Sequence, residues 1–299
     1  MALTINTNLS SMIVQSNLSK ATTSLNQAIE RMTTGYKINH ASDNAAGYSI
    51  ARNWEAKLGS LDVAADNAAT GADMLSTLED HYALISQHVQ RVRDLTEQAA
   101  NGTYGSASLK AINSEITARL EEIDRIAVNC EFNGISLMDG TTNHSIAIQV
   151  GIDGDPARSQ ITLNSNLFES GKIDKIFKDY GGVTNASVKE VAKLCSGYDM
   201  DAGEMTSSKP SAMLEKIDNV INEISKRVTT LGAAQNRVES AIESIGVQSE
   251  NITSSLSTLR DADVATESSN YIKAQILQQA SATLLATANQ TPSIALNLL

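Results

Sequence analysis

The stretch that decides the fold is residues 214–259, LEKIDNVINEISKRVTTLGAAQNRVESAIESIGVQSENITSSLSTL. Its apolar positions recur at alternating steps of three and four residues, and only Gln235 and Ser249 are polar on this stripe. A seven-residue repeat sustained over this length predicts a helix that packs in a left-handed supercoil against partner helices. The stripe consists of Leu214, Ile217, Ile221, Ile224, Val228, Leu231, Gln235, Val238, Ile242, Ile245, Ser249, Ile252, Leu256 and Leu259.

The partner helices must have matching length, and only residues 44–128 offer them. The apolar spacing predicts one helix over residues 44–99, with Ser42 or Asp43 as its cap, and another over residues 106–128. These segments belong to the N-terminal part of the chain, so the N-terminal and C-terminal parts are expected to pair. The predicted fold class is therefore mainly α, an elongated antiparallel coiled-coil or helical bundle.

Between the two parts the periodicity changes to that of strands. Residues 144–150 alternate polar and apolar, residues 151–155 form a turn, and residues 160–163 suit a returning strand. We expect a small β-hairpin region near residues 144–163. Residues 166–209 hold short mixed patterns, which predict a small insertion without specifying its fold.

The two ends of the chain share a lack of charge. No charged side chain precedes Lys20, and none follows Lys273. Both ends nevertheless show helical apolar patterns, and the N-terminal one stops at Thr34-Gly35, within a connector expected over residues 34–51. A surface helix normally carries charge on its wet side, so these ends are expected to meet each other and other copies of the chain. The apolar positions are Val14, Leu18, Ala21, Leu25, Ala28 and Met32, and then Ile272, Ile276, Leu277, Ala280, Leu284 and Ala288.

The composition favours long helices in a narrow bundle over a wide globular core. Only 4% of the 299 residues are aromatic, and only three are proline. The net charge of −11 argues against nucleic acid or an anionic membrane as partner, because no cluster of lysine and arginine exists to bind phosphates. Neither a secretory signal peptide nor an apolar run of about 20 residues, as a membrane span needs, is seen.

An enzyme is the first rival interpretation, and its motifs are missing. His81 and His88 lie two helical turns apart, not the one turn of a helical metal pair, and Glu79-Asp80-His81 does not extend to HExxH. Neither GxxxxGK[ST] nor GxSxG occurs. Asp153-Gly154-Asp155 resembles part of a calcium loop but lacks the remaining ligands. We expect no catalysis, no cofactor and no metal.

The two cysteines, Cys130 and Cys195, are too few for a disulfide framework. Neither has a second cysteine or a histidine at the spacing of a zinc site. Two free thiols are favoured, and a single bridge is the alternative.

Several long motifs resemble those of the bacterial flagellins, in order and at the family's spacing. The opening stretch INTNLSSMIVQSNLSKATTSLNQAIERMTTGYKINHASDNAAGYSIA is one, and QRVRDLTEQAANGTYG, INSEITARLEEIDRIA and FNGISLMDG follow it. The closing stretch SSLSTLRDADVATESSNYIKAQILQQASATLLATANQTPSIALNLL is another. The resemblance covers roughly residues 1–165 and 210–299, and it departs from the family's pattern at Tyr36 and His40.

The resemblance implies an organisation in three parts. Residues 1–43 and 260–299 would form a terminal coiled-coil inner core domain, residues 44–165 and 210–259 a long-helix outer core domain, and residues 166–209 a surface-exposed variable insertion. It further implies a structural subunit, exported unfolded by the flagellar type III system, that polymerises into the extracellular filament for swimming motility. The filament core contacts would be Val14, Leu18, Leu25, Met32, Ile272, Ile276, Leu277 and Leu284.

The resemblance also implies partners besides other subunits. The filament cap and the hook–filament junction proteins would contact the assembled chain. Arg91, Leu95 and Glu115 match the residues through which flagellins contact the vertebrate Toll-like flagellin receptor, and subunit packing is the alternative role for them. A flagellar export chaperone would bind Ile272, Ile276, Leu277, Leu284 and Leu285.

The hook–filament junction protein of the same export system is the second interpretation, because it shares the terminal coiled-coil pattern. The runs QILQQA and ANQ, the latter just before Thr291-Pro292, favour a flagellin. A filament subunit is made in far more copies than a junction protein, so abundance discriminates between the two.

Overall fold

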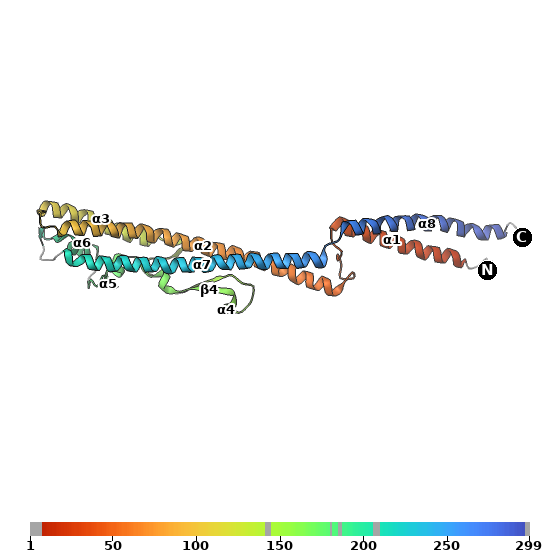
Figure 1. Cartoon of the computed structure of the whole chain (residues 1–299), viewed down its shortest axis with the longest axis horizontal. Helices are drawn as coiled ribbons and strands as arrows, with labels where there is room; N and C mark the ends of the chain where they lie inside the picture. Colours follow the sequence, from red (N-terminus) through yellow and green to blue (C-terminus); the bar gives the residue numbers. More distant parts are fainter. Residues whose placement is uncertain (1–7, 141–144, 180, 185–186, 206–209, 297–299) are drawn as a thin grey trace. The chain divides into compact units, whose positions relative to one another are not determined.

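The structure is a computed structural model that describes residues 8–140, 145–179, 181–184, 187–205 and 210–296 (Figure 1). The chain divides into two compact units. The terminal unit comprises residues 1–59 and 249–299, and the central unit comprises residues 60–248. Both boundaries fall inside long helices, α2 (Ala45–Ala100) and α7 (Ser211–Arg260). Each unit therefore combines an N-terminal with a C-terminal part of the chain, as the pairing of matching helices predicts.

In the terminal unit, α1 (Leu9–Thr34) and α8 (Val264–Leu296) pack side by side in opposite directions (Figure 1). The Asn8 side chain caps α1 by accepting a hydrogen bond from the backbone N–H of Ser11. α1 ends at Gly35, whose φ of 76° is the left-handed conformation that closes a helix, with its N–H donated to the Arg31 carbonyl. The predicted stop at Thr34-Gly35 is confirmed.

A short backbone bridge joins the connector to the break between α7 and α8. Tyr36 pairs with Asp261 in an isolated antiparallel bridge. The Lys37 N–H donates to the Arg260 carbonyl at 2.7 Å, and the Ala262 N–H donates to the Gly35 carbonyl at 2.8 Å. The helical pattern around Leu256 is thus interrupted at residues 261–263.

α2 begins at Ala45, within one residue of the predicted helix start, so the connector ends before the expected residue 51. The expected caps, Ser42 or Asp43, are wrong, because the Asn44 side chain accepts the Gly47 N–H at 3.0 Å. Asp43 instead accepts the N–H groups of Asn39 and His40, at 3.1 and 3.0 Å, so its carboxylate closes the turn before the cap. These hydrogen bonds hold the pKa of Asp43 below its usual value, the bond from His40 first.

In the central unit, α2, α3 (Ser106–Asn129) and α7 pack around one core (Figure 1). Arg93 on α2 pairs with Asp218 on α7 at 2.6 Å, and Gln235 donates to the Glu79 carboxylate at 2.8 Å. These contacts confirm a mainly helical fold in which the two parts of the chain pair. Its most deeply buried large side chains include Leu75, Leu78, Tyr82, Ile85, Leu95, Ile116, Leu120 and Ile123.

The buried seam of α7 differs from the predicted stripe at alternate positions. Ile217, Ile224 and Leu231 are buried as expected. At the alternate positions of the repeat, the buried residue lies one position before the predicted one. The reason is that α7 packs in a core with α2, α3 and the insertion, so a face wider than a two-helix seam is covered. Met213, Val220, Arg227 and Ala234 are buried, while the predicted Leu214, Ile221, Val228 and Gln235 are half-buried.

The predicted hairpin is present. β3 (Ile146–Gln149) pairs antiparallel with β4 (Gln160–Leu163), with Ile146 opposite Leu163. The turn between them contains the one-turn helix α4 (Pro156–Ser159), which the Asp155 side chain caps. A second hairpin, β1 (Glu131–Phe132) with β2 (Ile135–Ser136), turns through Asn133-Gly134, where both residues have positive φ, 49° and 76°.

The described part of the segment predicted as an insertion, residues 166–209, contributes side chains to the central core. It contains the 3-10 helix η1 (Ser165–Phe168), α5 (Ile173–Asp179), α6 (Val188–Ser196) and the pair β5 (Tyr198–Asp199) and β6 (Glu204–Met205). Its side chains Phe168, Phe177 and Cys195 are buried in the same cluster as α2 and α3. The described part of this segment thus lies in the central unit, and its role as a surface-exposed variable insertion stays a prediction.

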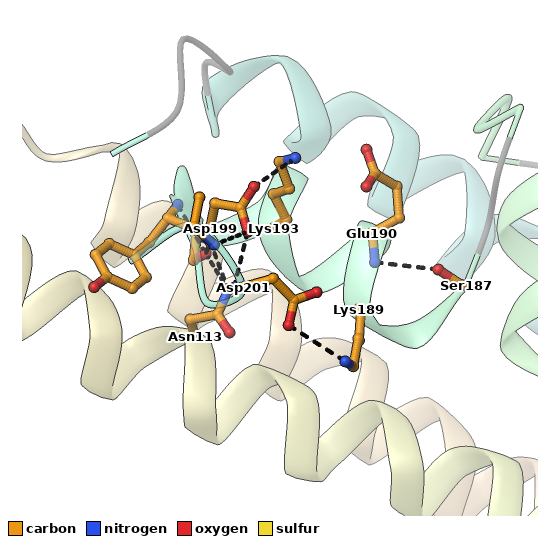
Figure 2. A network of polar contacts seen from close by, with 10 residues as sticks. Asn113, Ser187, Lys189, Glu190, Lys193, Asp199 and Asp201 are labelled. Atoms are coloured by element: carbon orange, nitrogen blue, oxygen red, sulfur yellow. Dashed lines mark hydrogen bonds and ion pairs between the residues drawn. The ribbon is translucent and has the colours of Figure 1, made fainter. Parts of the chain in front are cut away.

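Buried polar groups attach this segment to α3 (Figure 2). The amide of Asn113 donates to the Ser196 hydroxyl at 2.7 Å and to the Tyr198 carbonyl at 3.0 Å. Lys193 pairs with Asp199 at 2.8 Å, and this ion pair holds the pKa of Asp199 below its usual value. The side chain of Asn113 on α3 thus provides hydrogen bonds to buried polar groups of the turn that follows α6.

Candidate functional site

The α1/α8 pair carries the residues that the sequence assigned to assembly. The two helices meet through small side chains: Ala21, Ala28 and Ala274 are buried. Val14, Leu18 and Leu25 are half-buried on the same face of α1.

The face of α8 that meets α1 shares only Ala288 with the predicted apolar stripe. Its covered positions recur at steps of four and three residues, but several are small or polar, which is why apolar spacing alone missed them. Ile272 and Ile276 lie elsewhere on the helix and are 54% and 59% exposed. The covered positions are Glu267, Tyr271, Ala274, Gln278, Ser281, Leu285 and Ala288.

A second set of side chains on the pair is apolar and exposed. Of the predicted contacts, Met32, Ile272, Ile276, Leu277 and Leu284 belong to it, whereas Leu285 is half-buried toward α1. Burial in the single chain therefore separates the predicted residues into an internal and an external group. The exposed group also contains Leu9, Met12, Ile13, Ile29 and Val264.

The charges of the pair are gathered along one groove. This groove, about 670 Å³, lies between α1 and α8 and has Leu277 and Leu284 on one wall. The two helices carry five charged residues, and four of them line the groove. The rest of the pair's described surface is consequently almost uncharged. The four are Lys20, Arg31, Glu267 and Lys273.

The structure separates the three predicted receptor residues. Arg91 and Glu115 form an ion pair on the surface between α2 and α3, with Nη2 and Oε1 2.9 Å apart. Leu95 is only 2% exposed and packs in the central core. Leu95 therefore lies inside the core of the single chain, and its contact with a receptor stays a prediction.

The cysteines and the other side chains considered for chemistry in the sequence lie in structural positions. Cys130 and Cys195 are free and buried, and burial raises the pKa of both thiols to about 12. In the described ranges, no three side chains of His, Cys, Asp or Glu gather as metal ligands would. The expected turn at Asp153–Asp155 is present, with Asp155 capping α4. Within the part of the chain that the structure describes, no helix combines the length and the apolar character that a bilayer crossing demands.

Comparison with known proteins covers both ends and the full length. The family model described as the bacterial flagellin N-terminal helical region matches residues 5–143, and the one described as the bacterial flagellin C-terminal helical region matches residues 214–299. The chain is 34% identical to a flagellin of Bacillus subtilis (strain 168), with 99% of both chains covered. It is 35% identical to a flagellin of Xenorhabdus nematophila, with 100% of both chains covered.

Among solved structures, a putative flagellar hook-associated protein from Vibrio parahaemolyticus has a TM-score of 0.59 at 14% identity, covering 73% of this chain and 100% of that one. A likeness at this identity concerns the fold alone. The matched regions include the motifs on α1, the start of α2, α3 and α8. On these matches and on the identity over its whole length, the chain belongs to the bacterial flagellins.

Proposed function

We propose that this chain is the structural subunit of a flagellar filament and that copies bind one another through the uncharged faces of α1 and α8. The observation that carries the proposal is the exposed apolar group on these helices. Ile272, Ile276 and Leu277 have no covering element within the described chain although they are large and apolar. Such a surface is typical of an interface with another molecule.

The charge distribution supports the same proposal. The terminal unit has seven basic and seven acidic residues, whereas the central unit has sixteen basic and twenty-seven acidic residues. The whole net charge of −11 thus belongs to the central unit. Because like charges repel when many copies are stacked, a neutral terminal unit suits the most closely packed part of a polymer.

The test is polymerisation of the purified protein on short filament seeds, followed by sedimentation and electron microscopy. We expect the parent chain to form filaments and the double variant Ile272→Ser/Ile276→Ser to raise the critical concentration about tenfold or more, since burying each side chain contributes roughly 1.5–3 kcal/mol. Val63→Ser is the control, because Val63 is equally exposed but lies in the central unit. A parent chain that stays unpolymerised with seeds would refute the proposal.

Further partners belong to the same proposal. An export chaperone would cover the exposed group on α8 before the subunit leaves the cell through the flagellar type III system, and the filament cap and junction proteins would contact it afterwards. In a pull-down with the chaperone, Ile272→Ser/Ile276→Ser should reduce binding, and removal of residues 260–299 should abolish it. Retention of the chaperone by the truncated chain would contradict this part.

A role as ligand of the vertebrate Toll-like flagellin receptor would rest on the exposed pair Arg91 and Glu115. Both side chains are accessible, and Arg119 lies 3.8 Å from the same carboxylate. Charge reversal at Arg91 should then abolish receptor signalling while polymerisation continues. Loss of both activities together would instead assign the pair to subunit packing.

The junction protein is the second candidate, because it would share the terminal coiled-coil pattern seen in the sequence. The sequence relatives at 34% and 35% identity are flagellins, which makes this candidate the weaker one. Electron microscopy of the seeded protein separates the two, since long filaments indicate a filament subunit and small closed rings indicate a junction protein.

A further inference from the structure

The seam between α1 and α8 contains polar contacts spaced along its length. Near one end, Arg31 Nη1 lies 3.2 Å from Glu267 Oε1. Further along, the Gln278 amide donates to the Thr22 hydroxyl at 3.3 Å, and at the other end the Ser11 hydroxyl donates to Asn289 Oδ1 at 2.8 Å. These contacts join residues that are 236, 256 and 278 positions apart in the chain and all belong to one antiparallel alignment of the two helices.

The apolar part of the seam distinguishes poorly between alignments. Its buried members, Ala21, Ala28 and Ala274, are identical in size. Sliding one helix by seven residues would bring side chains of the same repeat opposite one another again, for example Leu18 in the place of Leu25, because the seam repeats every seven residues. Apolar packing therefore favours pairing but selects its register only weakly.

The ion pair does select a register. The Glu267 side chain is 10% exposed and that of Arg31 is 27% exposed, so both charges are largely removed from water. A slip of seven residues in one direction would place Arg31 beside Ala274, and in the other direction Glu267 beside Ser24. Either slip would leave a mostly buried charge without its partner, which is strongly unfavourable.

We propose that Arg31 and Glu267 are positioning residues that lock the register of the α1/α8 pair. A single buried polar contact in a repetitive helical seam is a known means of fixing alignment. The hydrogen bonds of Thr22 and Ser11 act in the same alignment, but as neutral groups with exposed neighbours they contribute less.

The lock has a consequence for assembly, and this step rests on the proposed function. The exposed group is divided between the helices, with Met12 and Ile13 on α1 and Ile272 and Ile276 on α8. A slip of seven residues would move one half past the other by roughly 10 Å, at about 1.5 Å per residue. A neighbouring copy that contacts both helices would then meet only one half of its binding surface.

Disulfide trapping in the full-length chain measures the register directly. In the native alignment Ser11→Cys should cross-link to Asn289→Cys, and after the slip that brings Glu267 beside Ser24 it should cross-link to Ala282→Cys, seven residues away. The buried Cys130 and Cys195 react slowly because burial raises the pKa of both thiols to about 12. The ratio of native to shifted cross-link is the readout, taken on free and on sedimented protein.

We expect Arg31→Glu to lower this ratio roughly tenfold, as coupling between contacting charges allows, and Arg31→Glu/Glu267→Arg to restore it. Lys273→Glu is the matched control, since it makes the same charge change in the same groove away from the Arg31–Glu267 contact. If Arg31→Glu only prevents pairing, the exchange variant decides: failure to recover the native cross-link overturns the proposal.

The two proposals fail in different ways. A parent chain that polymerises while Arg31→Glu keeps the parent cross-link ratio overturns the register lock and leaves the filament function standing. A parent chain that does not polymerise overturns the filament function, while a ratio that responds to Arg31→Glu and recovers in the exchange variant still supports the lock.

Discussion

Arg227 occupies a buried position in the α7 seam that the heptad pattern did not single out. Its side chain is only 6% exposed, and it pairs with Glu169 at 2.6 Å and with Glu223 at 3.7 Å. It also donates to the Tyr82 hydroxyl and to the Ser170 carbonyl. One guanidinium thus joins α2, α7 and the segment after η1, which is a role that arginine's several donors permit.

Removing this guanidinium should destabilise the central unit. We expect Arg227→Ala to lower the free energy of unfolding by about 1–3 kcal/mol, because the Tyr82 hydroxyl and the Ser170 carbonyl lose this buried donor. Arg227→Met should lose less, since it keeps an apolar stem in the seam. Chemical unfolding followed by circular dichroism measures both, and exposed Lys226→Ala is the control, expected to stay within about 0.5 kcal/mol of the parent. Equal stability of Arg227→Ala and Lys226→Ala would be inconsistent with this role.

Asp124 provides a prediction about pH. Burial raises the pKa of its carboxyl, although the Ile173 N–H, donated at 2.7 Å, acts in the opposite direction. A raised pKa in the folded chain means that this group favours folding at low pH and that its contribution is lost as the pH rises through the folded pKa. Asp124→Asn keeps an acceptor without the buried charge and should therefore raise the thermal midpoint at neutral pH but not in strong acid.

The carboxyl of Asp199 offers the opposite case as a control. Its pKa is lowered by Lys193 first and then by backbone N–H groups, so its contribution is present at neutral pH and lost as the pH falls through the folded pKa. Asp199→Asn should therefore lower the midpoint at neutral pH. Thermal scans at several pH values that show the same sign for both variants would contradict this assignment.

At the scale of elements, the β3–β4 hairpin approaches α2 closely at one glycine. A Cβ on Gly71 would clash with Cδ1 of Ile148, whereas a Cβ on Gly59 of the same helix would meet nothing within 4 Å. We expect Gly71→Ala to destabilise by about 1–3 kcal/mol through overpacking. Gly59→Ala should stabilise by roughly 0.5–1 kcal/mol because alanine favours a helix. Unfolding curves give both values, and Gly71→Ala/Ile148→Val should recover most of the loss.

The α1/α8 pair is the element that assembly should change most. Its described buried side chains are few and mainly small, namely Ala21, Ala28, Glu267, Ala274 and Ser281. A seam of this kind offsets the entropy of ordering two long helices only in part, since each residue costs roughly 1–2 kcal/mol. We expect backbone amide protection in α1 and α8 to rise strongly on polymerisation, with little change around Ile85 in the central core. Equal protection of α1 and α8 in subunit and polymer would disprove this.

At the scale of the whole molecule, the separation of charge predicts a salt dependence. The central unit carries the entire net charge of −11, and copies brought together in a polymer bring these charges together. Screening shortens from about 30 Å at 0.01 M salt to about 8 Å at 0.15 M salt. The critical concentration for polymerisation should therefore decrease when the salt concentration is raised from about 0.01 M to about 0.15 M. Asp62→Asn/Asp66→Asn, which removes two exposed charges, should weaken the dependence, and a rise with salt would contradict it.

Much of the architecture was predictable because it depends on local repetition. The bounds of α2 and α3 agree with the predicted 44–99 and 106–128 to within one residue, since periodicity and turn signals act over a few residues. The hairpin partners β3 and β4 follow from alternation and a turn in the same way. Family membership follows from the long motifs, which are themselves local.

The sequence by itself thus determined which segments are helices, that the two parts of the chain pair, and that the ends lack charge. Only the tertiary structure decided which face of each helix is covered: Arg227 in the seam, Ala274 rather than Ile272 against α1, and Leu95 inside the core. It also decided that Asn113 holds residues 196–198 against α3. The physical reason is that a periodic pattern depends on the helix alone, whereas the burial of each residue depends on every element that packs against that helix.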